Sequence, residues 1–91
     1  MGIRWVYESE RLGNGSYLVD FYLPELKTWV DVKGKFEPRD NFLLKDVAAY
    51  LKRERNERLY VFSASKAYAV NSRSFHEINH KLFWSKISNG S

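Results

Sequence analysis

The sequence predicts an α/β (α+β) fold with a central mixed sheet of about four strands and flanking helices. Segments 17–23 and 28–33 are typical of two strands joined as a hairpin. Segment 40–56 repeats apolar residues at helical spacing, and a short apolar run follows at 59–62. Because a strand, helix, strand passage closes right-handedly, we expect segment 59–62 to lie parallel to segment 28–33 in one sheet.

Length and composition indicate one small domain over residues 1–91. Hydrophobic residues make up 44% of the chain, which is enough for a packed core. The chain has no cysteine, so disulfides, thiolate metal sites and cysteine nucleophiles are excluded. No apolar run is long enough for a membrane span and no signal-peptide pattern is present, so we expect a soluble, cytoplasmic protein without a membrane partner. A net charge of +4 favours a polyanionic partner, although it also fits an ordinary soluble basic protein.

The first third of the chain predicts two strands around a turn. Ile3, Trp5 and Tyr7 recur with a period of two, which indicates a strand that ends near residue 10. Segment 12–16 is rich in glycine and asparagine and predicts a hairpin turn. We expect 17–23 to be one continuous strand, with its odd-numbered residues on one face and its even-numbered residues on the other.

The middle of the chain predicts a polar loop and a long helix. The loop follows Gly34 and ends at Asp40, a good helix-capping residue. The helix is expected to begin at Arg39 or Asp40 and to reach about Asn56. Residues 59–62 are all apolar, which indicates a strand buried on both faces.

The last third predicts a loop and a second helix. Segment 63–68 is expected to be a loop rich in hydrogen-bond donors. Ser74 and Glu77 have the spacing of a capping box, so a last helix is expected to start there, with Phe75 and Ile78 on its apolar side.

The hairpin of 17–23 and 28–33 concentrates charge at one point. Asp20 ends one strand region, while Asp31 and Lys33 lie two positions apart on the next and share a face. Two carboxylates and a backbone carbonyl, that of Val32, are the oxygen ligands that suit Mg²⁺, a hard ion that keeps several waters. A lysine beside them can orient or activate an attacking water and neutralise a phosphate. This arrangement predicts metal-assisted cleavage of nucleic acid.

A solvated cross-strand charge cluster is the alternative explanation of these residues. An isolated Asp-x-Lys is a short pattern, and exposed pairs of this kind contribute about 1 kcal/mol or less each. The metal site is favoured by an aspartate on the preceding strand, by Gly34 directly after the lysine, and by a helix that follows a polar loop.

Together these segments resemble the core of the PD-(D/E)XK nuclease superfamily, and most closely the endonuclease I (Holliday junction resolvase) family of T-odd bacteriophages. The family's Pro-Asp-Phe-Leu-Leu-Pro, Val-Glu-Thr-Lys-Gly and Phe-Ser-Ser-Ser segments are similar to Val19-Asp20-Phe21-Tyr22-Leu23-Pro24, Val30-Asp31-Val32-Lys33-Gly34 and Val61-Phe62-Ser63-Ala64-Ser65. The resemblance covers most of residues 3–68. It implies a restriction-endonuclease-like core, with Asp20 and Asp31 as metal ligands and Lys33 as the catalytic lysine.

The chain departs from this family pattern in three places. Val19 replaces the motif's proline, and Asp31 replaces the commoner glutamate. The family's N-terminal helix, which supplies a further active-site glutamate, has no counterpart before the first strand, and neither Glu8 nor Glu10 is an obvious substitute. The glutamate is then dispensable, or comes from another subunit, or the domain is a shortened version.

Further polar residues follow the site in sequence and are candidates for contacts with DNA. They are Lys35, Arg39, Lys45, Ser63, Ser65 and Lys66. For Lys35, Arg39 and Lys45 a solvated surface position is an equal alternative. For Ser63, Ser65 and Lys66 the family resemblance favours a phosphate contact over a plain loop. His76 and His80 have the i, i+4 spacing of metal ligands but lack a carboxylate partner, so surface positions are expected for them.

The three tryptophans are expected in the core or in an interface. Trp5, Trp29 and Trp84 are large apolar side chains with one polar atom each. Trp29 shares the face of Asp31, so a position at the border of the substrate groove is the alternative for it.

The function that these observations predict is a Mg²⁺-dependent DNA endonuclease, with Mn²⁺ able to substitute. By resemblance it cleaves branched junctions and is phage-encoded, which would place it in the host cytoplasm; a sequence-specific homing or restriction enzyme acting on duplex DNA is the alternative. Two paired cuts require two sites, so a homodimer or higher homo-oligomer is expected. A DNA-binding or assembly module that keeps the fold without cleavage is the alternative from another class.

Overall fold

The computed structural model describes residues 5–7, 10–13, 15–35, 37–63, 66–79 and 81. Its elements in chain order are β1 (Val6–Tyr7), β2 (Arg11–Leu12), β3 (Tyr17–Leu18), β4 (Phe21–Leu23), a 3₁₀ turn η1 (Pro24–Leu26), β5 (Thr28–Lys33), α1 (Pro38–Arg55), β6 (Arg58–Ser63), β7 (Lys66–Val70) and β8 (Phe75–Ile78). The prediction of a mixed α and β fold is confirmed.

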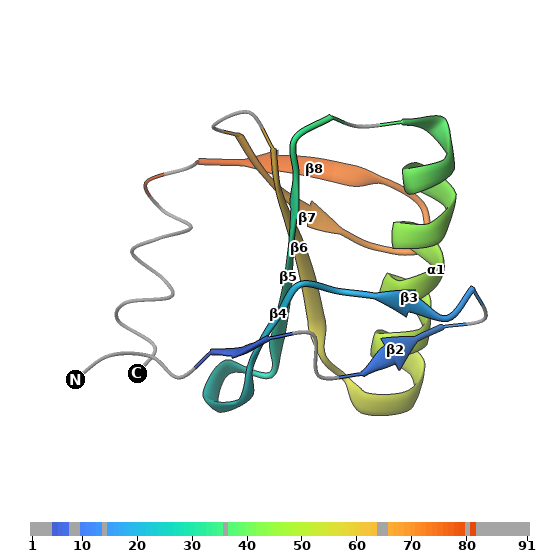
Figure 1. Cartoon of the computed structure of the whole chain (residues 1–91), viewed down its shortest axis with the longest axis vertical. Coiled ribbons are helices and arrows are strands. Elements are labelled where there is room, and N and C mark those ends of the chain that lie inside the picture. The colour runs from blue at the N-terminus through green and yellow to red at the C-terminus, as the bar shows by residue number, and fades with distance from the viewer. Residues whose placement is uncertain are drawn as a thin grey trace.

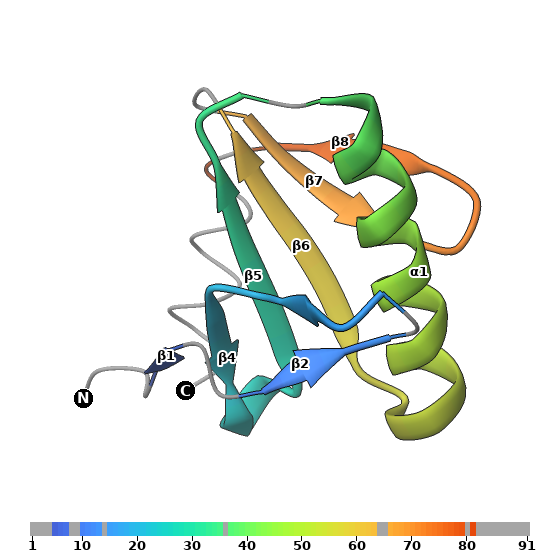
Figure 2. The ribbon, with the colours of Figure 1, turned by 45° about the vertical axis from the view of Figure 1, so that its right-hand side comes forward.

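Within the described residues six strands, and not the expected four or so, form one mixed sheet in the order β1-β4-β5-β6-β7-β8, and α1 lies against one of its faces (Figures 1 and 2). The β5–β6 pair is parallel, as the strand, helix, strand passage predicted, and the other neighbours pair antiparallel. Among the described residues α1 is the one long helix, so the expectation of flanking helices is met on one face of the sheet in this part of the chain.

The helix α1 begins and ends at residues suited to those positions. Glu37 is the N-cap, Pro38 opens the first turn, and a capping box joins Glu37 to Asp40. Asp40 was expected to cap the helix itself; it is instead the third helical residue, and its carboxylate accepts the Glu37 N–H. Asn56 takes the left-handed conformation that ends helices.

Among the described residues, apolar side chains form a core on each face of the sheet. Under α1, Trp29 and Leu59 pack with Leu44, Val47 and Leu51 of the helix. On the opposite face Val30 packs with Leu23 and Ala67. Alternation along β5 therefore sends Trp29 and Val30 to different cores, and it puts Asp31 on the helix side.

A small hairpin, β2–β3, closes the helix-side core at its edge (Figure 2). Gly13 in its turn has a φ of +74° and lies so close to α1 that a Cβ atom there would be 2.5 Å from the Asp46 carboxylate. The Gly15 N–H donates to the same carboxylate at 3.3 Å. A glycine-rich turn therefore lets the hairpin approach the helix.

The continuous strand predicted at 17–23 is wrong. The chain bends at Asp20, so that Tyr17 and Leu18 pair with β2 while β4 joins the main sheet. The bend shifts the alternation: Val19 and Tyr22 both pack on the helix side, although they were expected on opposite faces.

The loop at 63–68 and the last helix from Ser74 are also wrong predictions within the described residues. Lys66 begins β7, which pairs with β6, and residues 75–78 form β8, which pairs with β7 in the register Val70↔Phe75 and Ala67↔Ile78. Asn71 makes the tight turn between them, because its side-chain oxygen accepts the N–H groups of Arg73 and Ser74 at 2.8 Å. The capping-box spacing of Ser74 and Glu77 therefore occurs at the start of a strand.

No helix among the described residues is long and apolar enough to cross a membrane.

Candidate metal centre

The register of β4 on β5 places Asp20 beside Asp31. Phe21 lies opposite Val30, so the next step along both strands brings Asp20 to the level of Asp31. The Asp20 N–H donates to Asp31 Oδ1 at 3.3 Å. Lys33 follows two residues later on the same strand face. The three residues that the sequence grouped together are therefore neighbours in space.

Asp31 is almost completely buried, with 2% of its surface exposed. Both of its carboxylate oxygens have partners: Oδ1 accepts the Asp20 N–H, and Oδ2 accepts the Tyr17 hydroxyl at 2.7 Å and lies 3.5 Å from Lys33 Nζ. Burial raises the pKa of Asp31, and the Tyr17 hydrogen bond and the Lys33 charge oppose that rise. Desolvation outweighs these two partners, as expected for a carboxylate so far from water.

The Lys33 ammonium lies between two carboxylates and an aromatic ring. Its Nζ is 3.5 Å from Asp31 Oδ2, 3.5 Å from Asp40 Oδ1 and 4.9 Å from the centre of the Tyr17 ring. Burial alone lowers the Lys33 pKa, but the Tyr17 hydroxyl and the two carboxylates outweigh it, so that the pKa is raised. Lys33 is therefore a fixed cation, still 21% exposed and accessible from solvent.

Asp20 and Val32 meet at the edge of β5 just beyond the last β4 pair. The Val32 N–H donates to Asp20 Oδ2 at 2.8 Å. The N–H and C=O of a strand residue point to the same side, so the Val32 carbonyl faces the edge on which Asp20 lies. Among the hydrogen bonds of the described residues, Asp20 Oδ1 takes part in none.

These oxygen atoms fit a hard divalent cation. Among the described side chains no three carboxylate, imidazole or thiol groups form a metal-binding cluster, so the candidate set is the Asp20 and Asp31 carboxylates and the Val32 carbonyl. Mg²⁺ is commonly held by one or two carboxylates while it keeps several waters. The Asp20 charge adds to burial in raising the Asp31 pKa, and a cation between the two carboxylates would reduce that repulsion.

Two residues of this cluster, Tyr17 and Asp40, were not assigned to it from sequence. Strict alternation along 17–23 puts Tyr17 on the face opposite Asp20, and only the bend at Asp20 brings the Tyr17 hydroxyl to Asp31. Asp40 was assigned to helix capping alone, whereas its two oxygens serve both the cap and Lys33. Asp40 could have been identified from the sequence, because it lies in the first turn of a helix that a short loop joins to Lys33.

The candidate DNA contacts gather partly around this cluster. Ser63 pairs with Lys33 across the parallel strands and is buried, while Lys66 starts β7 opposite Ser63 and is exposed. Lys35 and Arg39 are exposed in the segment from β5 to the first turn of α1. These cations flank the carboxylates at one end of the sheet.

Of the remaining two candidates, Lys45 does not belong to this group in the described structure. Lys45 lies about 7.5 Å along α1 from Asp40, at a rise of about 1.5 Å per residue, and its Nζ is 5.9 Å from the centre of the Phe75 ring. Ser65 lies outside the described residues.

Glu10 does not supply a further acidic group to the cluster. Its carboxylate accepts two hydrogen bonds from Arg55, at 2.6 and 2.9 Å. Arg55 ends α1, whereas Asp40 lies in the first turn, about 20 Å away at about 1.5 Å per residue. Glu8 lies outside the described residues.

The histidine and tryptophan expectations have mixed outcomes. His76 is exposed, as expected, but lies on β8, so helical spacing to His80 does not apply; His80 and Trp84 lie outside the described residues. Trp29 is 1% exposed, stacks on Tyr22 and donates to Glu57 at 2.9 Å. It is a core residue, and its suggested place at a substrate groove is wrong.

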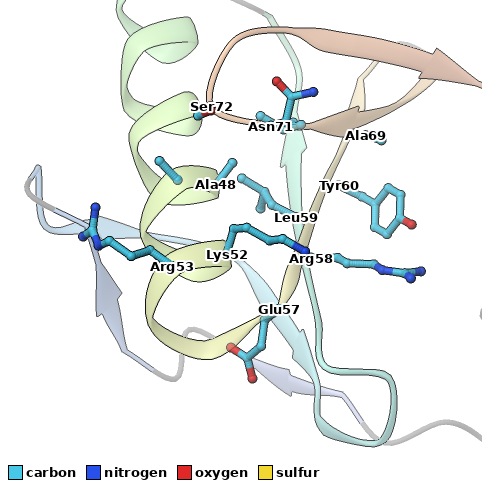
Figure 3. Close-up of a pocket in the computed structure, with 12 residues that line it drawn as sticks. Ala48, Lys52, Arg53, Glu57, Arg58, Leu59, Tyr60, Ala69, Asn71 and Ser72 are labelled. Atoms are coloured by element: carbon cyan, nitrogen blue, oxygen red, sulfur yellow. The ribbon is translucent and has the colours of Figure 1, made fainter.

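A pocket of about 550 Å³ lies at the other end of β6, away from this cluster (Figure 3). Small apolar side chains such as Ala48 and Ala69 line it, and Lys52 extends from α1 toward β6 while Arg53 points away. The distance from Arg58 to Ser63 along the strand is about 16 Å, at about 3.3 Å per residue. The pocket is therefore separate from the carboxylates.

Comparisons with family models, with curated proteins and with solved structures found no match for this chain.

Proposed function

We propose that this protein is a metal-dependent DNA endonuclease that hydrolyses phosphodiester bonds at the Asp20, Asp31 and Lys33 cluster. The observation that carries the proposal is the convergence of two carboxylates and a lysine at the end of β5, with one carboxylate buried and the lysine still accessible. A solvated charge cluster would not require a 2% exposed aspartate. Exposed cations at the same end of the sheet, Lys35, Arg39 and Lys66, suit a phosphate backbone.

The residues of this cluster have different roles in the proposed reaction. Asp20, Asp31 and the Val32 carbonyl would hold Mg²⁺, which supplies Lewis-acid stabilisation of the reacting phosphate when it is bound. The attacking water gives a proton to solvent as its oxygen bonds to phosphorus, the phosphorus–oxygen ester bond breaks, and the departing oxygen takes a proton from solvent. Lys33 stabilises the negative charge that develops on the non-bridging phosphate oxygens during this step. Asp40 keeps the Lys33 ammonium beside the cluster.

Cleavage is tested with a four-way junction and a linear duplex, in Mg²⁺, in Mn²⁺ and in chelator. The proposal predicts cutting in either metal and none in chelator, and predicts that Asp20→Asn and Lys33→Ala lose at least about a hundredfold in rate, the usual loss for a group that stabilises the transition state. Binding of DNA by the wild type without metal-dependent cutting would support the non-catalytic module instead. Unchanged cutting by either variant would remove that residue from the site.

The junction is the substrate that the family resemblance favours. Preferential cutting of the four-way junction supports a resolvase, which would act as a homodimer because paired cuts need two sites. Equal cutting of both DNAs contradicts this preference, and cutting at one sequence of the linear duplex indicates the homing or restriction alternative. Sedimentation of the free protein and of its junction complex gives the oligomeric state.

A further inference from the structure

Tyr17 connects the small hairpin to the candidate metal centre. It lies on β3, outside the main sheet, and is partly buried. Its hydroxyl donates to Asp31 Oδ2 at 2.7 Å, and its ring centre is 4.9 Å from Lys33 Nζ. One side chain therefore contacts both the carboxylate and the cation.

The contact determines how Asp31 is held. The Asp20 N–H holds Oδ1 at 3.3 Å, and Tyr17 and Lys33 hold Oδ2. Without the Tyr17 hydroxyl, Oδ2 keeps only the Lys33 contact, at 3.5 Å. The carboxylate could then turn about its χ2 bond, and Oδ1 would lose its fixed place beside Asp20.

We propose that Tyr17 is a positioning residue of the metal centre, whose hydroxyl orients the Asp31 carboxylate so that Asp20 and Asp31 bind one divalent cation together. Groups that hydrogen-bond a metal ligand commonly change metal affinity by about 10- to 100-fold when they are removed. The inference rests on the proposed metal centre for its role in cleavage, but its effect on metal affinity is measured without any DNA.

Tyr22 offers a matched control within the same chain. Its hydroxyl also donates to a carboxylate, Glu57 Oε2, at 2.6 Å, and Glu57 also accepts the Trp29 indole N–H. Tyr22→Phe and Tyr17→Phe therefore remove the same atom and the same kind of hydrogen bond. They differ in whether the carboxylate belongs to the metal centre.

The experiment measures Mn²⁺ affinity of the intact chain by calorimetry, for wild type, Tyr17→Phe and Tyr22→Phe. The proposal predicts affinity about 10- to 100-fold weaker for Tyr17→Phe and unchanged for Tyr22→Phe. Mn²⁺ that binds only the folded protein raises the midpoint of urea unfolding, and the size of this rise is a second measure of affinity. This measurement can also be made on a variant of low stability. In cleavage, Tyr17→Phe should need correspondingly more metal and should approach the wild-type rate when the metal is saturating.

A purely structural role for Tyr17 gives a different result. Tyr17→Phe would then lower the urea midpoint as Tyr22→Phe does and leave Mn²⁺ affinity unchanged, which overturns the proposal. Absence of Mn²⁺ binding by the wild type also overturns it. Mn²⁺ binding that depends on Tyr17, in a protein that does not cut DNA, supports the positioning role while contradicting the endonuclease.

Discussion

At the scale of single residues, Lys33 is the residue that connects the charged groups of the centre. Its ammonium is 3.5 Å from both the Asp31 and the Asp40 carboxylates. A buried ion pair is weak evidence for stability, because removing charges from water offsets much of their attraction. The grouping of two carboxylates around one accessible lysine therefore fits the proposed chemistry with an anionic substrate better than a role in folding alone.

Arg39 and Arg53 allow the proposed DNA face to be tested residue by residue. Both are exposed on α1: Arg39 is in the first turn, next in sequence to Asp40, whose carboxylate pairs with Lys33, and Arg53 is in the last turns. If phosphates bind near the carboxylates, Arg39→Gln should weaken DNA binding and lower the slope of log affinity against log salt by about 1. Salt titrations of DNA binding in chelator, which would prevent the proposed cleavage, measure both quantities.

Arg53→Gln is the matched control for this comparison. Its Nε pairs with Glu54 at 2.7 Å, at the far end of the helix. Arg53→Gln should leave the slope of log affinity against log salt unchanged. Equal decreases in DNA affinity for the two variants would show that DNA binding is spread over the whole basic surface.

At the scale of elements, the first turn of α1 links folding to the site through Asp40. Oδ2 accepts the Glu37 N–H at 3.0 Å, and Oδ1 pairs with Lys33. Asp40→Ala loses both contacts and should lower the free energy of unfolding by about 1 kcal/mol, the usual effect of removing a capping side chain. Asp40→Asn keeps an oxygen for the cap and should stay close to wild type.

Urea unfolding of the two Asp40 variants checks this prediction. Asp40→Asn should also lower the cleavage rate, because Lys33 loses one of the groups that hold it. Equal destabilisation by Asn and Ala would show that the ion pair, and not the capping hydrogen bond, accounts for the stability at this position.

The last turn of α1 is joined to the first strand region by Glu10 and Arg55. The Arg55 hydrogen bond lowers the Glu10 pKa below its ordinary value of 4.5. The folded state thus favours the ionised form, so this stabilisation is present above that ordinary value and is lost as the pH falls through the lowered pKa. Because Glu10 is 45% exposed, water screens the pair and its contribution is about 1 kcal/mol or less.

Glu10→Gln should therefore lower the free energy of unfolding at neutral pH and converge with wild type as the pH falls through the lowered Glu10 pKa. Urea unfolding over a series of decreasing pH values measures the difference. Glu54→Gln, which removes a pair between adjacent residues at the same helix end, is the control. A difference between Glu10→Gln and wild type that persists at low pH would contradict the ion-pair explanation.

At the scale of the whole molecule, local sequence pattern predicted the elements that position the site, and long-range contacts determined the rest. The hairpin of β4 and β5, the helix and the parallel β6 follow from alternation, helical spacing and the crossover rule. The β7 and β8 strands escaped prediction because their residues are partly polar and are ordered by pairing with β6 and with each other.

Of the candidate site, the sequence likewise predicted the residues that neighbouring strands bring together, and not those that long-range contacts add. Asp20, Asp31 and Lys33 are brought together by one short turn, so their spacing predicted their meeting. Tyr17 and Asp40 reach the cluster through the bend at Asp20 and through the approach of α1 to β5, which no local pattern encodes. The helix-side burial of Trp29 depends likewise on Glu57, 28 residues away, as its hydrogen-bond acceptor.

The central claim is that Asp31 and Lys33 act together in one metal-dependent centre. The most direct test compares the DNA cleavage rates of wild type, Asp31→Asn, Lys33→Met and the double variant. All four are measured at saturating Mg²⁺ and in chelator. We predict chelator-sensitive cutting by wild type, a loss of about 10²–10³-fold for each single variant, and little further loss in the double variant, because groups that act as a unit are not additive. Absence of metal-dependent cutting by wild type, or single losses that multiply in the double variant, would contradict this account.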